Sequence, residues 1–413
     1  MDDLPAPCPS GAPQNRARGR KRAGPQARGP AVAGRGVPVT GLVPCLQTLS
    51  GAGVPDTVCV VDGNPSHASH VASALMPLYR VEHYSNASPA LIAMRASAPA
   101  VLMVDVVTPP RDGYAFVRSL RREQAFARLP IIVTSTGNAA GLAASARECG
   151  ADAAMQKPYR RSVLVAAISS LRNRDIEGAW NALPPLQRDV LNGTVRVFHA
   201  LADSLATGAP VPFSVMTDAC RPLVEAVARN DFKDILAGVR DHDNYTYVHS
   251  LRVAALLTMF GQAAGLGVSD QLVLASGGLL HDVGKMAVPH EVLNKPGRLD
   301  DAEYAAMKGH VAETVRLLRA SPDIPEPVVK IAEQHHEKLD GTGYPHGLAG
   351  RHLNELARMA AIVDVFSALT DRRIYKPAMD ADEALAVMSD GMKGHLDQHF
   401  LSLFKDMLMA AAV

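Results

Sequence analysis

Val101-Leu102-Met103-Val104-Asp105 is a run of four apolar residues that ends in a carboxylate. Similar short apolar runs, Val58–Val61 and Ile131–Val133, lie on either side of it, and segments of helical period separate the three. This alternation predicts a parallel sheet covered by helices on both faces. We therefore expect a doubly wound α/β domain over residues 54–175.

The second half of the chain has a different pattern. Strand signals stop beyond Asp175, and residues 184–413 are almost wholly helical in period. The sequence therefore predicts a multidomain protein in which an all-α domain follows the α/β domain. We expect the later segments to be a helical linker at 176–240, which could also pair two subunits into a homodimer, a helical domain at 241–400 and a helix end at 401–413.

Composition excludes several classes of protein. Hydrophobic residues make up 47% and charged residues 20% of the chain, so the bulk of it must be globular. Residues 1–53 are rich in Pro, Gly, Ala and Arg, and we expect them to form a disordered basic tail. The remaining residues carry a net charge of −4, which argues against a nucleic-acid partner.

Cysteines and hydropathy bear on the compartment. The five cysteines form no C-x-x-C pair, so the sequence indicates neither a disulfide framework nor a cysteine-ligated zinc site. No apolar run approaches the length of roughly 18 residues that a membrane span needs. We expect a soluble, cytoplasmic protein with no membrane span.

Four polar residues follow the predicted strands. Asp62 ends the first strand, Asp105 the next and Ser135 a later one, and Lys157 comes 22 positions after Ser135. An aspartyl nucleophile for phosphoryl transfer needs a nearby cation, a hydroxyl group and acidic ligands for Mg²⁺. The carboxyl ends of parallel strands meet at one edge of a sheet, so these four side chains form a candidate pocket.

The pattern over residues 56–174 resembles the receiver domain of two-component response regulators, which has a flavodoxin-like fold. The resemblance implies that Asp105 is the phosphoacceptor, that Ser135 and Lys157 contact the phosphoryl group, that Mg²⁺ binds there, and that a sensor histidine kinase is the partner. Two positions depart from the family: Gly63 replaces a second acidic residue, and Ala154 replaces the usual aromatic. We therefore expect weak phosphorylation or none.

Histidines and aspartates recur at intervals along the predicted helical half. Imidazole nitrogens and carboxylate oxygens suit Fe²⁺, Mn²⁺ and Zn²⁺, and the set is too large for one tetrahedral ion, which favours two. An ionised carboxylate within the apolar helix around Asp364 is costly unless it is paired or metal-bound. The candidate metal ligands are His249, His281, Asp282, His310, His335, His336 and Asp364.

Three motifs in this half occur in the order typical of HD-GYP domains, the family that hydrolyses cyclic di-GMP: His-Asp-x-Gly-Lys at 281–285, His-His-Glu at 335–337 and Asp-Gly-Thr-Gly-Tyr-Pro at 340–345. The resemblance implies that Asp282 bridges two ions, with Fe or Mn preferred. Tyr245 stands where some members have a further glutamate ligand, which favours two ions over three. Residues expected to contact substrate are Lys285, Gly343, Tyr344, Pro345, Arg373 and Lys376.

The sequence therefore predicts a phosphodiesterase that hydrolyses cyclic di-GMP to pGpG, with further trimming to GMP open, under the control of a receiver domain. Asp282 and Lys285 are the expected catalytic residues. Two alternatives remain. One is a non-catalytic module that binds cyclic di-GMP or a partner protein, and the other is a metal-dependent phosphohydrolase that acts on another nucleotide.

Overall fold

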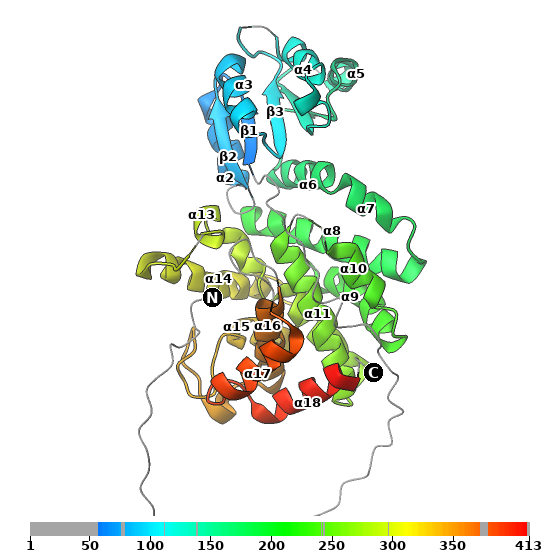
Figure 1. Ribbon diagram of the computed structural model, residues 1–413, viewed down its shortest axis with the longest axis vertical. Coiled ribbons are helices and arrows are strands. Elements are labelled where there is room, and N and C mark those ends of the chain that lie inside the picture. Colours follow the sequence, from blue (N-terminus) through cyan, green and yellow to red (C-terminus); the bar gives the residue numbers. More distant parts are fainter. Residues whose placement is uncertain are drawn as a thin grey trace, which may run out of the picture.

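The computed structural model of the chain describes residues 57–75, 79–110, 112–137, 139–240, 242, 244–295, 297–371 and 379–410. The predicted basic tail at 1–53 lies outside them. Figure 1 places an α/β domain at one end of the molecule and a larger helical half at the other.

Five parallel strands form a single sheet in the order β2-β1-β3-β4-β5. This confirms the predicted doubly wound α/β fold. Two strands, both at the edges, have no apolar run and were not predicted. The strands are β1 (Thr57–Val61), β2 (Arg80–Tyr84), β3 (Val101–Asp105), β4 (Ile131–Ser135) and β5 (Ala153–Gln156).

Helices cover both faces of this sheet. Alternate residues of the central strands point to opposite sides, so that Val58 and Val60 enter one apolar core and Cys59 and Val61 the other. The first core contains α2 (Pro65–Leu75) and α6 (Arg161–Arg172). The second contains α3 (Ala87–Ala96), α4 (Gly113–Arg121) and α5 (Ala139–Cys149), with a short 3₁₀ turn at Gln124–Phe126.

The second half is helical, as expected. It comprises α7 (Arg174–Trp180), α8 (Pro185–Thr207), α9 (Phe213–Ala228), α10 (Lys233–Val239), α11 (Tyr245–Ala263), α12 (Val268–Leu280), η2 (Val283–Ala287), α13 (His290–Leu293), α14 (Asp301–Arg319), α15 (Glu326–Gln334), η3 (Gly350–His352), α16 (Glu355–Thr370), α17 (Ala381–Gly391) and α18 (Gln398–Ala410).

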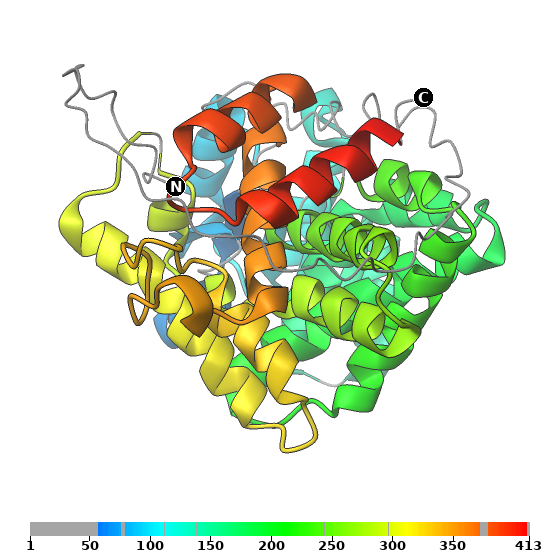
Figure 2. The same cartoon turned by 90° about the horizontal axis from the view of Figure 1, so that it is seen from below.

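One apolar core runs through these helices from Trp180 to Leu408. Helices α8 to α10, which form the predicted linker, bury their apolar faces in that core, and α8 also packs against α6 of the α/β domain. Seen from below in Figure 2, the last helices of the chain, in orange and red, lie across this half. The linker helices are therefore packed into the same unit as the helices that follow them.

Helix α14 illustrates how local sequence fixes an element. The Asp300 side chain accepts a hydrogen bond from the backbone of Glu303, and the Glu303 side chain accepts one from the backbone of Asp300. This capping box satisfies two amide groups at the helix start. Within the part of the chain that the structure describes, no helix is long and apolar enough to cross a bilayer.

Candidate metal centre

Side chains from five helices meet inside the helical half. His249 lies in the second turn of α11, His310 lies within α14, and Asp364 lies within the buried part of α16. The His281-Asp282 and His335-His336 pairs lie where α12 and α15 end. The structure thus brings together all seven predicted metal ligands, which are His249, His281, Asp282, His310, His335, His336 and Asp364.

These seven residues form two groups that share Asp282. One group is His249, His281, Asp282 and Asp364, the other is Asp282, His310, His335 and His336, and within each the ligand atoms lie within 4.8 Å of one another. Oδ2 of Asp282 lies 3.3 Å from Nε2 of His281, whereas Oδ1 lies 3.2 Å from Nε2 of His310. The two oxygens of one carboxylate therefore face different groups.

Backbone contacts orient three of the histidines. Nδ1 of His281, His310 and His335 each contacts the carbonyl oxygen three residues earlier, at 2.8, 2.6 and 2.9 Å. A carbonyl only accepts, so Nδ1 must donate, and in the neutral imidazole the lone pair of Nε2 then points into the centre. These three Nε2 atoms are buried and have no hydrogen-bond partner among the residues that the structure describes. Such buried, unsatisfied nitrogens fit a metal ion.

The charges of the centre favour a cation. Burial disfavours charge on His281, but the carboxylates of Asp282 and Asp364 outweigh it and raise the pKa of His281 to about 10. Burial also opposes ionisation of Asp282, yet Lys285 and His281 hold the pKa of that carboxyl well below its usual range. Without a metal, the carboxylates therefore draw a proton onto His281, and a divalent ion would supply that positive charge instead.

Gly284 allows the His-Asp motif to approach α14. Its amide donates to Oγ1 of Thr314 at 2.9 Å, and a Cβ atom at Gly284 would lie 2.6 Å from that oxygen and closer still to the carbonyl oxygen of His310. Nζ of Lys285 lies 2.5 Å from Oδ2 of Asp282. The 281–285 motif thus places a cationic side chain beside the centre and a glycine where two backbones meet.

The loop at 337–348 is built around a buried glutamate. Oε1 of Glu337 accepts from the amide of His346 at 2.6 Å and Oε2 from that of Leu348 at 2.9 Å. A Cβ atom at Gly343 would overlap the backbone of residues 336–338. Glu337 and Gly343 therefore hold the loop in shape, a role that the sequence analysis did not assign to them.

The rest of this loop lies beside one ligand group. The ring of Tyr344 stacks on His336, with centroids 4.7 Å apart and planes inclined by 27°. Pro345 is exposed. Arg373 and Lys376, the predicted phosphate-binding residues, lie outside the described residues.

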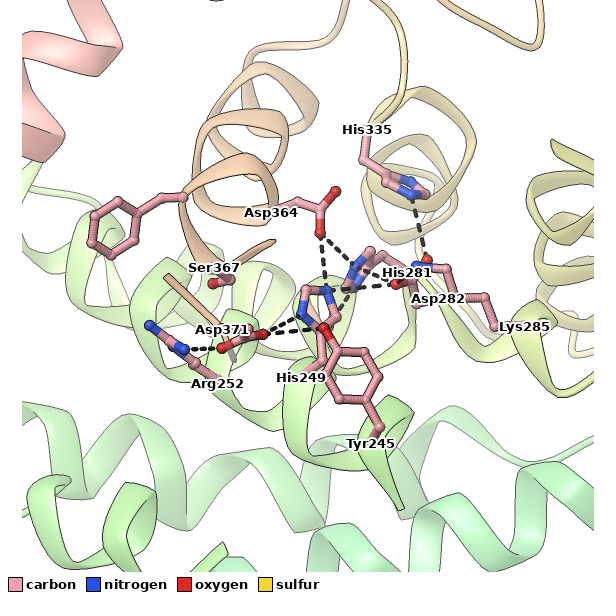
Figure 3. A network of polar contacts seen from close by, with 12 residues as sticks. Tyr245, His249, Arg252, His281, Asp282, Lys285, His335, Asp364, Ser367 and Asp371 are labelled. Carbon is pink, nitrogen blue, oxygen red and sulfur yellow. Dashed lines mark hydrogen bonds and ion pairs between the residues drawn. The ribbon is translucent and has the colours of Figure 1, made fainter. Parts of the chain in front are cut away.

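Two buried charged residues next to the centre were not predicted from the sequence. Asp371 contacts Nδ1 of His249 at 3.3 Å and forms an ion pair with Arg252 (Figure 3). Asp371 is 1% exposed and Arg252 is 3% exposed. The available signal was their spacing, since Arg252 follows His249 by one helical turn and Asp371 follows Asp364 by two.

The pocket of the α/β domain forms at the predicted sheet edge. Nζ of Lys157 lies 2.5 Å from a carboxylate oxygen of both Asp62 and Asp105. Ser135, at the end of β4, is buried and its hydroxyl accepts from the amide of Gly137. Lys157 thus connects the two carboxylates that the sequence placed in one pocket.

One neighbour of this pocket was not predicted. Nδ1 of His67 lies 2.5 Å from Oδ2 of Asp62, and its Nε2 lies 2.6 Å from the hydroxyl of Tyr159. The carboxylate of Asp62 also accepts from the amide of Asn64. Burial raises the pKa of Asp62, but the contacts with His67 and Lys157 outweigh this and lower it. This carboxylate is therefore engaged by three protein groups, which are His67, Lys157 and the amide of Asn64.

Comparison with known proteins assigns both halves. Residues 58–169 match the family model of the response regulator receiver domain, and residues 233–400 match that of the HD domain. The HD domain implies binding of divalent metal, for which the two His/Asp groups are the candidate sites.

Three relatives illustrate the range of similarity. A cyclic di-GMP phosphodiesterase of Pseudomonas aeruginosa is 43% identical over 171 residues, 41% of this chain and 41% of the relative. The 3'3'-cGAMP-specific phosphodiesterase 3 of Vibrio cholerae is 38% identical over 165 residues, 40% of this chain and 35% of the relative. The cyclic di-GMP phosphodiesterase response regulator RpfG of Xanthomonas campestris is 28% identical over 320 residues, 77% of this chain and 78% of the relative.

The chain spans less than half of the length of the first two of these relatives, and most of the length of the third. A match of 320 residues to the third must include part of both regions that the family models cover. The five-stranded parallel sheet and the helical half agree with those two assignments. The chain therefore combines a response regulator receiver domain with a helical HD domain.

Proposed function

We propose that this protein is a metal-dependent phosphodiesterase that hydrolyses cyclic di-GMP to pGpG, with further trimming to GMP left open, at a two-ion centre within residues 241–400. The observation that carries the proposal is the position of Asp282, whose two oxygens face two separate groups of histidine ligands. The names of relatives that are 43% and 28% identical to this chain support cyclic di-GMP as the substrate.

The donor atoms favour particular metals. One group offers two imidazoles and two carboxylates, and the other offers three imidazoles and one carboxylate. Such mixed nitrogen and oxygen sets suit Fe or Mn. When bound, a pair of ions supplies electrostatic stabilisation for the attacking and leaving oxygens of an in-line displacement at phosphorus.

The protein's own residues have separate roles in this proposal. Asp282 would hold both ions, and Lys285 would neutralise a nonbridging phosphate oxygen of the substrate. Tyr344, with Gly343 and Pro345, forms the rim of the nucleotide site next to His336. Arg373 and Lys376 complete the binding of the substrate phosphates.

A second candidate substrate is 3'3'-cGAMP. A Vibrio cholerae relative that is 38% identical over 165 residues is named a phosphodiesterase specific for it. Both molecules are cyclic dinucleotides with the same scissile bond, so the same two-ion centre serves either reaction. The difference between them must then come from contacts with the bases.

The receiver domain is the proposed regulator of this activity. Asp105 is the candidate phosphoacceptor, but Gly63 supplies no carboxylate and Asp62 is already engaged by Lys157 and His67. We therefore infer weak Mg²⁺ binding and weak phosphorylation by a sensor histidine kinase. A change in the pairing of two subunits through residues 176–240 would carry the signal to the HD domain.

The test is a product analysis with purified, metal-loaded protein. It is incubated with cyclic di-GMP or with 3'3'-cGAMP, and the products are separated by chromatography. Asp364→Ala should abolish hydrolysis because it removes a buried ligand candidate, whereas Asp406→Ala, the same change at an exposed position of α18, should not. Binding of either dinucleotide without cleavage by the wild-type protein would instead identify a non-catalytic module.

A further inference from the structure

His249 is oriented differently from the three other histidines described above. Those use a backbone carbonyl to fix the ring, whereas Nδ1 of His249 contacts a side chain, Oδ2 of Asp371, at 3.3 Å. Nε2 of His249 lies 2.9 Å from Oδ1 of Asp364, on the opposite side of the ring. The imidazole therefore stands between a carboxylate of the candidate metal centre and a carboxylate outside it, as Figure 3 shows.

Asp371 is itself held in place on several sides. Arg252 binds its second oxygen, and the other end of this guanidinium donates to Oγ1 of Thr370 at 2.7 Å. The hydroxyl of Tyr245 lies 3.4 Å from Oδ2 of Asp371, and the Tyr245 ring stacks on His249. The carboxylate is buried, and the guanidinium of Arg252 compensates its charge.

A carboxylate that accepts a hydrogen bond from one nitrogen of a metal-bound imidazole fixes the ring and makes the other nitrogen a stronger ligand. We propose that Asp371 is a positioning residue that strengthens the binding of one ion, the one held by His249, His281, Asp282 and Asp364. Arg252 holds this carboxylate in place. The proposal rests on the two-ion centre proposed above.

The ion held by the other group should not depend on Asp371. Asp371 contacts His249, which belongs to the first group, whereas the second site is formed by Asp282 with His310, His335 and His336. Loss of Asp371 should therefore affect the two ions unequally. A purely structural role, in which Asp371 only neutralises the buried Arg252, predicts no such difference.

The experiment compares variants of the full chain in Mn²⁺ binding. The double variant Arg252→Met/Asp371→Leu removes both buried charges, so it leaves no unpaired arginine, and Arg252→Lys keeps the carboxylate and a cation beside it. Affinities are measured by calorimetry without substrate, and electron paramagnetic resonance distinguishes a coupled Mn²⁺ pair from a single ion. Thermal unfolding of the metal-free proteins checks that each variant folds.

We expect the double variant to bind one ion as the wild type does and the other about 10- to 100-fold more weakly, with loss of the coupled signal. Arg252→Lys should keep both ions. Wild-type affinity for both ions in the double variant, equal weakening of both, or fewer than two ions in the wild type would each overturn the proposal. A failure to cleave cyclic dinucleotides would overturn the proposed function and leave this result unchanged, because no substrate is present.

Discussion

Gly284 offers a test of how close packing shapes the metal centre. It lies between Asp282 and Lys285, at the point where η2 approaches α14. The atoms that a methyl group at this position would meet include the backbone nitrogen of Thr314, at 2.7 Å, and its Oγ1, at 2.6 Å. Backbone atoms of a helix cannot rotate away, so Gly284→Ala must move η2 and α14 apart.

The size of the effect follows from these distances. Ordinary contacts need separations of about 3.4 Å or more, so the two elements must shift by roughly 1 Å. Overpacking of this kind costs about 1–3 kcal/mol, and loss of the Gly284–Thr314 hydrogen bond costs about 1 kcal/mol more. A misplacement of about 1 Å in a catalytic centre lowers the rate by about 10²-fold. We therefore expect a folded but less stable protein with about 1% of the wild-type rate.

The assay combines thermal unfolding, metal content and hydrolysis of the substrate. The matched control is Gly309→Ala, next to His310 in the same helix, because a Cβ atom there has nothing within 4 Å. That change should leave activity intact and stabilise α14 by about 0.5–1 kcal/mol. Wild-type stability, metal content and rate in Gly284→Ala would refute the argument from packing.

Three further predictions concern other parts of the molecule. Addition of Mn²⁺ to metal-free protein at about pH 8 should release about one proton per chain, because His281 is protonated below its raised pKa of about 10 and must lose that proton to bind metal. A pH indicator measures the release, and no release would contradict the assignment of His281 as a metal ligand. Tyr344→Ala should lower turnover with metal content nearly unchanged, because the stacking of Tyr344 on His336 contributes only about 0.5–1.5 kcal/mol. Loss of metal would instead show that the loop at 337–348 supports the metal centre. Gly63→Asp should strengthen Mg²⁺ binding by the receiver domain, because it adds a carboxylate at a position where a Cβ atom has nothing within 4 Å. Calorimetry measures this affinity, and robust acetyl-phosphate labelling of the unmodified chain at Asp105, with a large change in rate, would show that the missing carboxylate matters little.

The sequence predicted the central strands and missed the two at the edges. A strand with helices on both faces is a continuous apolar run, as at Val101–Val104, and is easily distinguished from its surroundings. The edge strand β2 has the sequence Arg-Val-Glu-His-Tyr, and β5 has Ala-Ala-Met-Gln. Their pairing comes from neighbours already in the sheet, which is information that no local pattern contains.

Part of the candidate metal centre could likewise be predicted from the sequence, and part could not. Residues adjacent in sequence, such as His281-Asp282 and His335-His336, were evident as pairs. The contact between His249 and Asp371 spans 122 positions, and it depends on how α11 packs against the end of α16. Glu337 was visible in its motif, but only the fold shows that both of its oxygens bind the backbone of the following loop.

The ligands of the centre come from α11, α14, α16 and the ends of α12 and α15, and two of them, His249 and Asp364, are 115 positions apart. Ions bound there would cross-link elements that meet only in the folded chain. At a free ion concentration of about 100 times the dissociation constant, such binding adds about 2.7 kcal/mol to the free energy of unfolding. Proteases degrade the unfolded chain, so scarcity of the metal would lower the amount of protein in a cell as well as its activity.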